Sequence, residues 1–211
     1  MIPSKEVMYA ALEERHGREL QMRLSEASVA VCGLGGLGSN IAVALARAGI
    51  GRLYLIDFDK VDISNLNRQQ YFAEQIGLPK TEALADTLGH IAPYCDIRTE
   101  CVKLTVDNIP RLLCNEDIIV EAFDKADQKA MLVNCVLESF PQKYLVSGSG
   151  MAGIAPANMI TTKRVTKRFY LCGDGVSDVE SGMGLVSSRV LICAAHQAHA
   201  VMRIIAEEFE V

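Results

Sequence analysis

Short apolar segments alternate with longer segments of helical periodicity through the first 150 residues of the chain. Most of the apolar segments have the length of buried strands. The predicted strands are 28–32, 51–56, 96–103, 117–121 and 143–147. The helices predicted between and after them are 40–49, 78–91, 106–114 and 125–140. This alternation predicts an α/β fold, with a Rossmann-like, doubly wound sheet that is mainly parallel.

The pattern differs at the two ends of the chain. Residues 5–24 are charged and predict one N-terminal helix. After Gly150, the sequence predicts two strands joined by a charged turn, then a glycine-rich loop and a final helix. These elements are 158–162, 167–170, 172–184 and 186–207. We expect the last third of the chain to extend the same sheet, because it contains further strands and no linker separates it from the rest.

Composition narrows the class of protein. Half of the 211 residues are hydrophobic, 22% are charged and the net charge is −5, which is typical of a globular domain. Nothing in this balance indicates nucleic acid or an anionic membrane as a partner. No apolar run reaches the roughly 20 residues of a membrane span, and the N-terminus lacks the apolar stretch of a signal peptide. We therefore expect a cytoplasmic protein.

The seven cysteines agree with that location. Their number is odd and no two have the C-x-x-C spacing, so a zinc cluster is not expected. Most lie in apolar segments and are expected to be small buried side chains.

A glycine loop between the first strand and the following helix provides the first candidate site. Gly33, Gly35 and Gly38 have the spacing G-x-G-x-x-G, which allows phosphate to approach backbone N–H groups at a helix N-terminus. Asp57 lies 19 residues beyond Gly38 at the end of the second strand, where an acid usually meets a ribose hydroxyl. These features fit an NAD-dependent dehydrogenase equally well, and a tight turn without a ligand remains an alternative.

The segment DFDKVDISNLNRQ, residues 57–69, separates these alternatives. It contains Asp59 and Arg68 and is followed by Lys80. A triphosphate needs such cations, since Arg offers a bidentate fork and Lys a mobile point charge, whereas a dehydrogenase does not need them here. Asp124 follows another buried strand, so the fold would bring it to the same sheet edge. The alternative is that Arg68 and Lys80 are ordinary surface charges.

The combined pattern resembles the adenylation domain of ubiquitin-activating-type enzymes. The shared motifs are G-x-G-G-L-G, D-x-D-x-V-x-x-S-N-L-N-R-Q and the later P-K, and the resemblance is strongest over residues 28–85. Among these enzymes, the chain is most similar to the bacterial sulfur-carrier adenylyltransferases of the ThiF and MoeB types. The resemblance implies one adenylation domain over 1–211. Its expected parts are an N-terminal helix (1–26), a nucleotide-binding core (27–150) and a sheet extension with the C-terminal helix (151–211).

The resemblance also implies roles for individual residues. Asp57 would bind the ribose, and Asp124 would be the magnesium-associated acid. Arg18 would reach the phosphates of a neighbouring subunit in a homodimer, with Arg15 as the alternative. The residues expected at the nucleotide are Gly33, Gly35, Gly36, Asp57, Asp59, Asn65, Arg68, Gln69 and Lys80. The residues expected to act in catalysis are Arg68, Lys80, Asp124 and Arg18.

The implied reaction uses Mg²⁺ and ATP to adenylate the C-terminal glycine carboxylate of a small ubiquitin-like carrier protein, releasing pyrophosphate. A terminal carboxyl group has a pKa of roughly 3.5, so no general base is needed. The difficulty is repulsion between two anions, which positioned cations relieve. The four histidines fall in helical patterns and are not expected to be catalytic.

The chain departs from many relatives in three ways. It lacks the two C-x-x-C pairs of a structural zinc site, so no zinc is expected. Cys172, in a glycine-rich segment, has the setting of an exposed thiol; a loop thiol without a role is the preferred interpretation, and a thiol that bonds to the carrier is the alternative. No rhodanese domain is expected after the last helix, which implies a separate sulfur donor.

Residues 147–153 are small, and they predict either a groove for a Gly-Gly tail or a simple strand-end turn. The preferred acceptor is the carrier of thiamine thiazole synthesis. Alternatives are a molybdopterin carrier or a tRNA-modification carboxylate. More distant alternatives are an NAD-dependent oxidoreductase and a non-catalytic scaffold.

Overall fold

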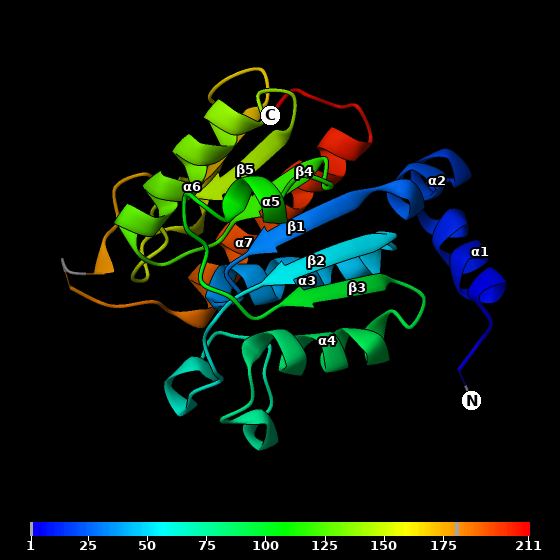
Figure 1. The fold of residues 1–211 in the computed structure, drawn as a ribbon, viewed down its shortest axis with the longest axis horizontal. Helices are drawn as coiled ribbons and strands as arrows, with labels where there is room; N and C mark the ends of the chain where they lie inside the picture. Colours follow the sequence, from blue (N-terminus) through cyan, green and yellow to red (C-terminus); the bar gives the residue numbers. More distant parts are fainter. Residues whose placement is uncertain (1, 180–181) are drawn as a thin grey trace.

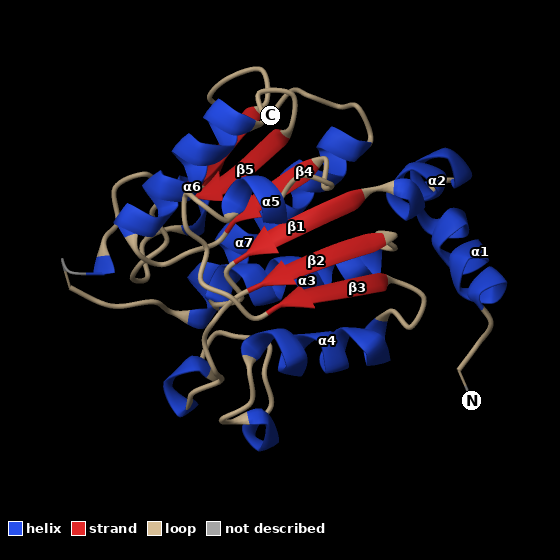
Figure 2. Cartoon of the chain, in the orientation of Figure 1, coloured by secondary structure: helices blue, strands red, loops and turns tan. Residues whose placement is uncertain are grey.

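One seven-stranded sheet forms the centre of the molecule (Figures 1 and 2). A computed structural model describes residues 2–179 and 182–211. The strand order is β3-β2-β1-β4-β5-β7-β6, and only the β6–β7 pair is antiparallel. The strands are β1 (Ser28–Cys32), β2 (Arg52–Ile56), β3 (Asp96–Glu100), β4 (Ile118–Glu121), β5 (Tyr144–Gly148), β6 (Thr161–Arg164) and β7 (Phe169–Gly173). The predicted fold class is confirmed, including the extension of the sheet by the last third of the chain.

Helices cover both faces of this sheet (Figure 1). The α-helices are α1 (Lys5–His16), α2 (Arg18–Glu26), α3 (Gly36–Ala48), α4 (Lys80–Ile91), α5 (Ile109–Leu112), α6 (Ala126–Ser139) and α7 (Ser187–Ile205). The short 3-10 turns are η1 (Ile63–Asn65), η2 (Ala73–Gln75) and η3 (Ala157–Met159). Among the described residues, no helix combines the length and the apolar character needed to cross a bilayer.

Alternate side chains of the strands pack into two separate cores. Val29 and Val31 of β1 belong to the core shared with α3, α4 and α7. Ala30 and Cys32, one position on, face the core shared with α5 and α6. Both faces of β1 are covered, which explains why the strand is apolar from Val29 to Cys32.

The strand order reverses its direction at β1. The chain moves from β1 to β2 on one side and later returns to place β4 on the other side. The register pairs Cys32 with both Ile56 and Glu121, so the three strands end at the same level. The loops beyond these ends flank the crevice in which doubly wound sheets bind their ligands.

Several predicted boundaries need correction. The single N-terminal helix 5–24 is two helices, because Gly17 has a φ of 89° and its N–H closes α1 on the carbonyl of Glu13. The first helix of the core begins at Gly36 rather than at residue 40, since the glycine loop itself supplies its first turn. The strand predicted at 96–103 ends at Glu100, and residues 102–104 turn toward the site described below.

The C-terminal elements are shifted along the chain. The strand predicted at 158–162 is Thr161–Arg164, because Pro156 precedes a 3-10 turn that occupies residues 157–159. The strand predicted at 167–170 starts at Phe169 and runs on to Gly173. The predicted glycine-rich loop 172–184 therefore begins later, and its residues 180 and 181 lie outside the described part of the chain.

Candidate active site

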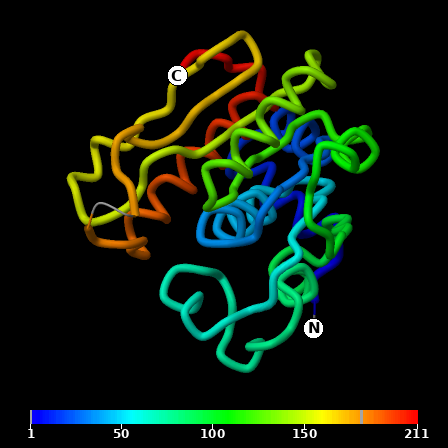
Figure 3. Tube along the Cα trace, turned by 60° about the vertical axis from the view of Figure 1, so that its left-hand side comes forward, coloured from blue at the N-terminus to red at the C-terminus, as the bar shows by residue number. Residues whose placement is uncertain are grey.

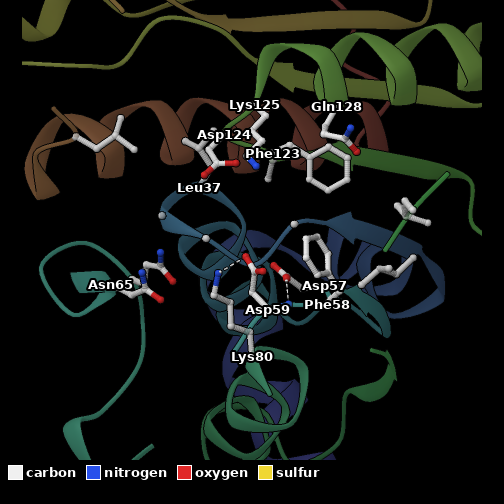
Figure 4. Close-up of a pocket in the computed structure, with 18 of the residues that line it drawn as sticks. Leu37, Asp57, Phe58, Asp59, Asn65, Lys80, Phe123, Asp124, Lys125 and Gln128 are labelled. Atoms are coloured by element: carbon white, nitrogen blue, oxygen red, sulfur yellow. Dashed lines mark hydrogen bonds and ion pairs between the residues drawn. The ribbon is translucent and has the colours of Figure 1, made fainter. Parts of the chain in front are cut away.

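A cavity of about 430 Å³ opens beyond the carboxyl ends of β1, β2 and β4, and we call it the carboxyl-edge cavity. Figure 4 shows side chains converging on it from the segment after β2, from α4 and from the turn after β4. Ten residues were predicted from the sequence to form the site within a single chain, and all ten line this cavity. They are Gly33, Gly35, Gly36, Asp57, Asp59, Asn65, Arg68, Gln69, Lys80 and Asp124.

The glycine loop passes close to the turn that follows β4. Gly33 has a φ of 91°, and a Cβ atom there would lie 2.8 Å from the ring of Phe123 and 2.9 Å from the carbonyl oxygen of Ala122. At Gly36, a Cβ atom would lie 2.9 Å from Val190 Cγ1 and 3.3 Å from Arg68 Cγ. Only glycine fits these two positions, so the loop and the first N–H groups of α3 form the floor of the cavity.

Asp57 joins the glycine loop to β2. Its carboxylate accepts hydrogen bonds from the N–H of Leu34 at 2.6 Å and from the N–H of Asp59 at 2.8 Å. Burial raises the pKa of Asp57, while the nearby Lys80 and these two hydrogen bonds act in the opposite direction. Each carboxylate oxygen can accept a further bond, so Asp57 can still take a hydroxyl from a ligand.

Lys80 is the buried cation of the site. Its side chain is 7% exposed and its Nζ lies 3.1 Å from Asp59 Oδ2 (Figure 4). The backbone also fixes the pair, because the N–H of Lys80 donates to the carbonyl of Asp59. A buried ammonium held in one place can counter negative charge with little reorganisation.

The segment 62–69 forms a compact turn that presents polar groups to the cavity. Asp62 and Asn65 cap the turn reciprocally, with side-chain to backbone bonds of 2.9 and 3.0 Å. Figure 3 shows the whole excursion between β2 and α4 standing away from the sheet. Helix α3 holds the excursion as well, since Asn40 Nδ2 donates to the carbonyl of Arg68 at 3.0 Å and the N–H of Gln70 donates to Ser39 Oγ at 3.1 Å.

Two polar atoms of this turn lack hydrogen-bond partners among the described residues. They are Arg68 Nε and Gln69 Oε1, and both are buried. Arg68 Nη1 binds only local acceptors, the carbonyl of Ser64 at 3.0 Å and Asn67 Oδ1 at 2.8 Å. Buried polar groups are normally paired, and both residues line the cavity, so a small movement of either side chain would let a ligand supply the missing partner.

The other end of the cavity is apolar and aromatic, and the sequence analysis missed it. Phe58 and Phe123 lie there, and Gln128 stands beside them (Figure 4). Val102 and Leu104 are also among the residues that line the cavity. The only available signal was Phe58 between the two acids of the D-x-D motif. The cavity thus has a flat apolar end and a charged end, which suits a molecule with a base at one end and phosphates at the other.

A buried network behind the cavity was missed as well. Glu121, wholly buried at the end of β4, accepts hydrogen bonds from the N–H of Phe123 at 2.7 Å and from Ser147 Oγ at 2.5 Å. Lys129 Nζ lies 3.0 Å from Glu121 Oε1 and donates to the carbonyl of Phe123 at 2.8 Å. Glu121 and Lys129 together bind the N–H and the carbonyl of Phe123. They therefore fix the turn that carries Asp124. The signal in the sequence that could have revealed this network was the acid Glu121 at the end of the largely apolar segment DIIVE.

Asp124 is the candidate metal residue. Its carboxylate is exposed and lines the cavity, and the described residues contain no group of three or more His, Cys, Asp or Glu that could hold a metal unaided. Mg²⁺ at nucleotide sites typically binds one or two carboxylates together with phosphates. A single carboxylate next to a phosphate site fits that requirement.

Other predicted features lie elsewhere. Arg18 is exposed on α2 and does not line the cavity, and Arg15 lines a different hollow beneath α1. The expectation that Cys172 is exposed was wrong: it is fully buried in β7, and burial raises the pKa of its thiol to about 11. In the segment 147–153, Met151 lines the cavity. None of the four histidines lines it.

Comparison with known proteins identifies similar chains. The sequence matches the family described as "ThiF family" over residues 9–210. It is 39% identical over 137 residues to "Adenylyltransferase and sulfurtransferase MOCS3" of Aedes aegypti, and 39% identical over 128 residues to "Ubiquitin-like modifier-activating enzyme 5" of Caenorhabditis elegans. These alignments cover 64% and 59% of this chain but 31% and 29% of the relatives, so the chain spans about a third of their length.

The fold resembles that of an Escherichia coli protein along the whole chain. The structure described as tRNA N6-threonylcarbamoyladenosine dehydratase, TcdA, in complex with ATP superimposes with a TM-score of 0.86. The two chains are 21% identical, and the match covers 99% of this chain and 98% of the other. At this identity the comparison supports the fold alone.

Proposed function

The chain belongs to the ThiF family, as its motifs predicted, and from this premise we propose that it is an ATP-dependent adenylyltransferase. Its substrate in this proposal is the C-terminal glycine carboxylate of a small ubiquitin-like sulfur carrier of the ThiS type. Adenylation of that carboxylate releases pyrophosphate and serves thiamine thiazole synthesis in the cytoplasm. The observation that carries the proposal is the convergence of Lys80, Arg68 and the N-terminus of α3 on one cavity with unpaired buried polar atoms.

The two ends of the cavity suggest how ATP lies in it. The adenine packs between the apolar side chains near Phe58 and Phe123, and the ribose meets Asp57. The phosphates then extend toward Gly35 and Gly36, where backbone N–H groups favour negative charge.

The charged end matches the demands of the reaction. The attacking carboxylate is ionised at neutral pH, so the protein needs no base. It must instead bring two anions together and stabilise the charge at the α-phosphorus, which Lys80 and Arg68 can do. Asn65 and Gln69 add polar contacts. Arg68 reaches the phosphates by exchanging its bonds to Ser64 and Asn67 for bonds to phosphate oxygens.

Asp124 would hold Mg²⁺ together with the phosphates. When bound, the ion would supply charge neutralisation to the departing pyrophosphate. The buried pair of Glu121 and Lys129 keeps the turn that bears Asp124 in place. We propose no resident zinc.

The mouth of the cavity suits a peptide tail. Met151 and Leu185 line it, and the nearby loops expose the apolar side chains of Ile154 and Met183. Exposed apolar groups beside a cavity are typical of a protein-binding surface. Sulfur would come from a separate donor protein, and the enzyme would be a homodimer in which Arg18 reaches the partner's site.

Alternative acceptors share this chemistry. A molybdopterin-type carrier would present the same tail, and the likeness to TcdA makes a carboxylate on tRNA worth including. An NAD-dependent oxidoreductase is the less favoured alternative, because it gives no role to the cluster around Arg68 and Lys80.

The test is ATP–pyrophosphate exchange with purified acceptors. The panel contains a ThiS-type carrier, a molybdopterin-type carrier, tRNA and no acceptor. The proposal expects exchange with the ThiS-type carrier, and none with that carrier after removal of its last glycine. Exchange with another acceptor alone would reassign the substrate, and NAD binding without ATP binding would reject adenylation.

A further inference from the structure

A buried ion pair joins three segments beside the cavity. The guanidinium of Arg189, in the first turn of α7, pairs with the carboxylate of Asp174, which follows β7. The two side chains are only 3% and 1% exposed. Burying such a pair costs desolvation energy, which the mutual attraction and further hydrogen bonds of the two groups must offset.

Arg189 also binds the loop that follows β5. Its Nη1 donates to the carbonyl of Ala155 and, at 3.0 Å, to that of Pro156. One guanidinium therefore connects α7, the 149–156 loop and the start of the 174–177 loop. Arginine can do this because its planar fork offers several donors in fixed directions.

Asp174 anchors its own loop from the other side. Its Oδ1 accepts the N–H groups of Val176 at 2.9 Å and Ser177 at 2.8 Å. Ser177 Oγ in turn accepts the N–H of Ala152 at 3.1 Å. The carbonyl of Gly184 accepts the N–H of Gly153 at 3.0 Å, so the loops are joined at several points. Figure 3 shows these segments running side by side.

The joined segments form one wall of the carboxyl-edge cavity. Met151 comes from the first loop, and Leu185 and Val190 flank Arg189 on either side along the chain. None of the residues that hold the nucleotide in the proposed function belongs to the pair or its partners. In the proposed function, this is the side of the cavity at which the acceptor enters.

We propose that the Asp174–Arg189 pair, which we call the latch, positions the acceptor side of the cavity for a narrow C-terminal tail. This inference rests on the proposed function. In this view the latch is a positioning device: it touches no reacting atom, and it sets the shape of the channel beside Met151. Its loss would impair the acceptor and leave nucleotide binding intact.

The deciding protein is the double variant Asp174→Asn with Arg189→Gln. Removing both charges leaves no unpaired buried charge, whereas the single variant Arg189→Gln strands a carboxylate and can unfold. Arg203→Gln is the matched control, since Arg203 lies on the same helix in an exposed pair with Glu208. Circular dichroism establishes that each variant is folded.

Exchange is then measured over a range of carrier concentrations, and ATP binding is measured by calorimetry. We expect the KM for the carrier to rise roughly 10- to 100-fold in the double variant, because a displacement of about 1 Å in a positioning group costs this much. We expect the Kd for ATP to stay within about twofold, because none of the described residues that hold the nucleotide in the proposed function bonds to Asp174 or Arg189. An unchanged KM in the folded double variant, or a parallel loss of ATP binding, would overturn the proposal.

Hydrogen–deuterium exchange separates the latch from the proposed function. The amides of Ala152 and Gly153 should exchange faster in the double variant, while that of Leu34, bonded to Asp57, should not change. Equal rates throughout would reject the latch. If no carrier supports exchange by the unmodified enzyme, the proposed function fails, and these amide rates still decide whether the pair holds the loops.

Discussion

Arg68 and Lys80 are two cations of one site, and their side chains differ in how firmly they are held in place. Lys80 is buried and paired with Asp59, so its position is set before any ligand arrives. Arg68 binds only neutral oxygens of its own turn and has a buried Nε without a partner among the described residues. A guanidinium in this condition gains most from a phosphate, which offers charged acceptors in a matching geometry.

Replacing Arg68 with alanine should therefore impair chemistry more than folding. We expect Arg68→Ala to lose carrier-dependent exchange by about 100-fold or more, the scale for removing one preorganised charge stabiliser. Its free energy of unfolding should change by less than about 1 kcal/mol, because the lost bonds are local and partly exposed. Arg47→Ala, an exposed arginine on α3, is the control and should retain full activity. Near-normal exchange by Arg68→Ala would contradict the assignment.

The charged residues of the site could be predicted individually from the sequence, whereas their surroundings could not. Asp57, Arg68 and Lys80 belong to a motif with fixed spacing, so their meeting at one sheet edge followed from the fold class. Phe123 and Val102 reach the cavity through turns whose geometry depends on packing from distant segments. Cys172 was misplaced for a related reason: β7 runs through it to Gly173 and buries it, although the glycine after it had indicated a loop.

At the scale of elements, the turn from β4 to α6 depends on the pair Glu121 and Lys129. Glu121 ends a strand whose other residues are apolar, and its carboxylate faces inward with no exposed surface. Lys129 and Ser147 bring the compensating donors from α6 and β5. The turn carrying Phe123 and Asp124 is thus held by three elements at once.

Removing one charge of this pair should destabilise the protein more than removing both charges. We expect Lys129→Met to lower the free energy of unfolding by about 3–5 kcal/mol, because it leaves a buried carboxylate unpaired. Adding Glu121→Gln should recover part of that loss, since the stranded charge is gone. Urea denaturation measures both, with Lys125→Met, an exposed lysine four residues earlier, as the control.

The same double variant should need more magnesium for ATP binding if the pair orients Asp124. A calorimetric titration of ATP at several magnesium concentrations measures this magnesium requirement without an activity assay. Equal stability of the single and double variants would contradict the energetic argument. An unchanged magnesium requirement would limit the pair to a structural role.

The limits of prediction at this scale come from glycines and strand ends. Apolar periodicity identified each helix and strand of the core, but it could not show that Gly17 ends one helix and separates it from the next. Nor could it show that α3 begins within the glycine loop, because glycines usually weaken a helix. These boundaries follow from backbone conformations that tertiary packing selects.

At the scale of the whole molecule, the two ends of the sheet have separate tasks. The cavity lies at the carboxyl ends of the strands, while α1 and α2 lie toward the opposite end (Figure 1). No residue of α1 is buried, and the helix borders a hollow of about 380 Å³ whose lining includes Tyr9 and Leu12 of α1 and Ile91 of the body. A helix with so little packing in its own chain is well placed to contact another copy.

Arg18 lies on this N-terminal arm, so within one chain it cannot assist the cavity. If it acts across a homodimer, two inactive variants should restore each other. Arg18→Ala and Arg68→Ala should each lose exchange by about 100-fold as homodimers. Co-expressed, they should recover about a quarter of normal activity, because half of randomly formed dimers are mixed and each has one intact site.

The mixture is compared with the two variants assayed separately at the same total concentration. Sedimentation establishes that dimers form and that the substitutions do not change their number. Arg15→Ala in place of Arg18→Ala tests the neighbouring arginine, and restoration only with Arg15→Ala would move the role to that residue. If Arg18 instead acts within its own chain, one site of a mixed dimer lacks Arg18 and the other lacks Arg68, so neither is intact. A mixture without any recovery above the separate variants would therefore show that the N-terminal arm does not complete a partner's site.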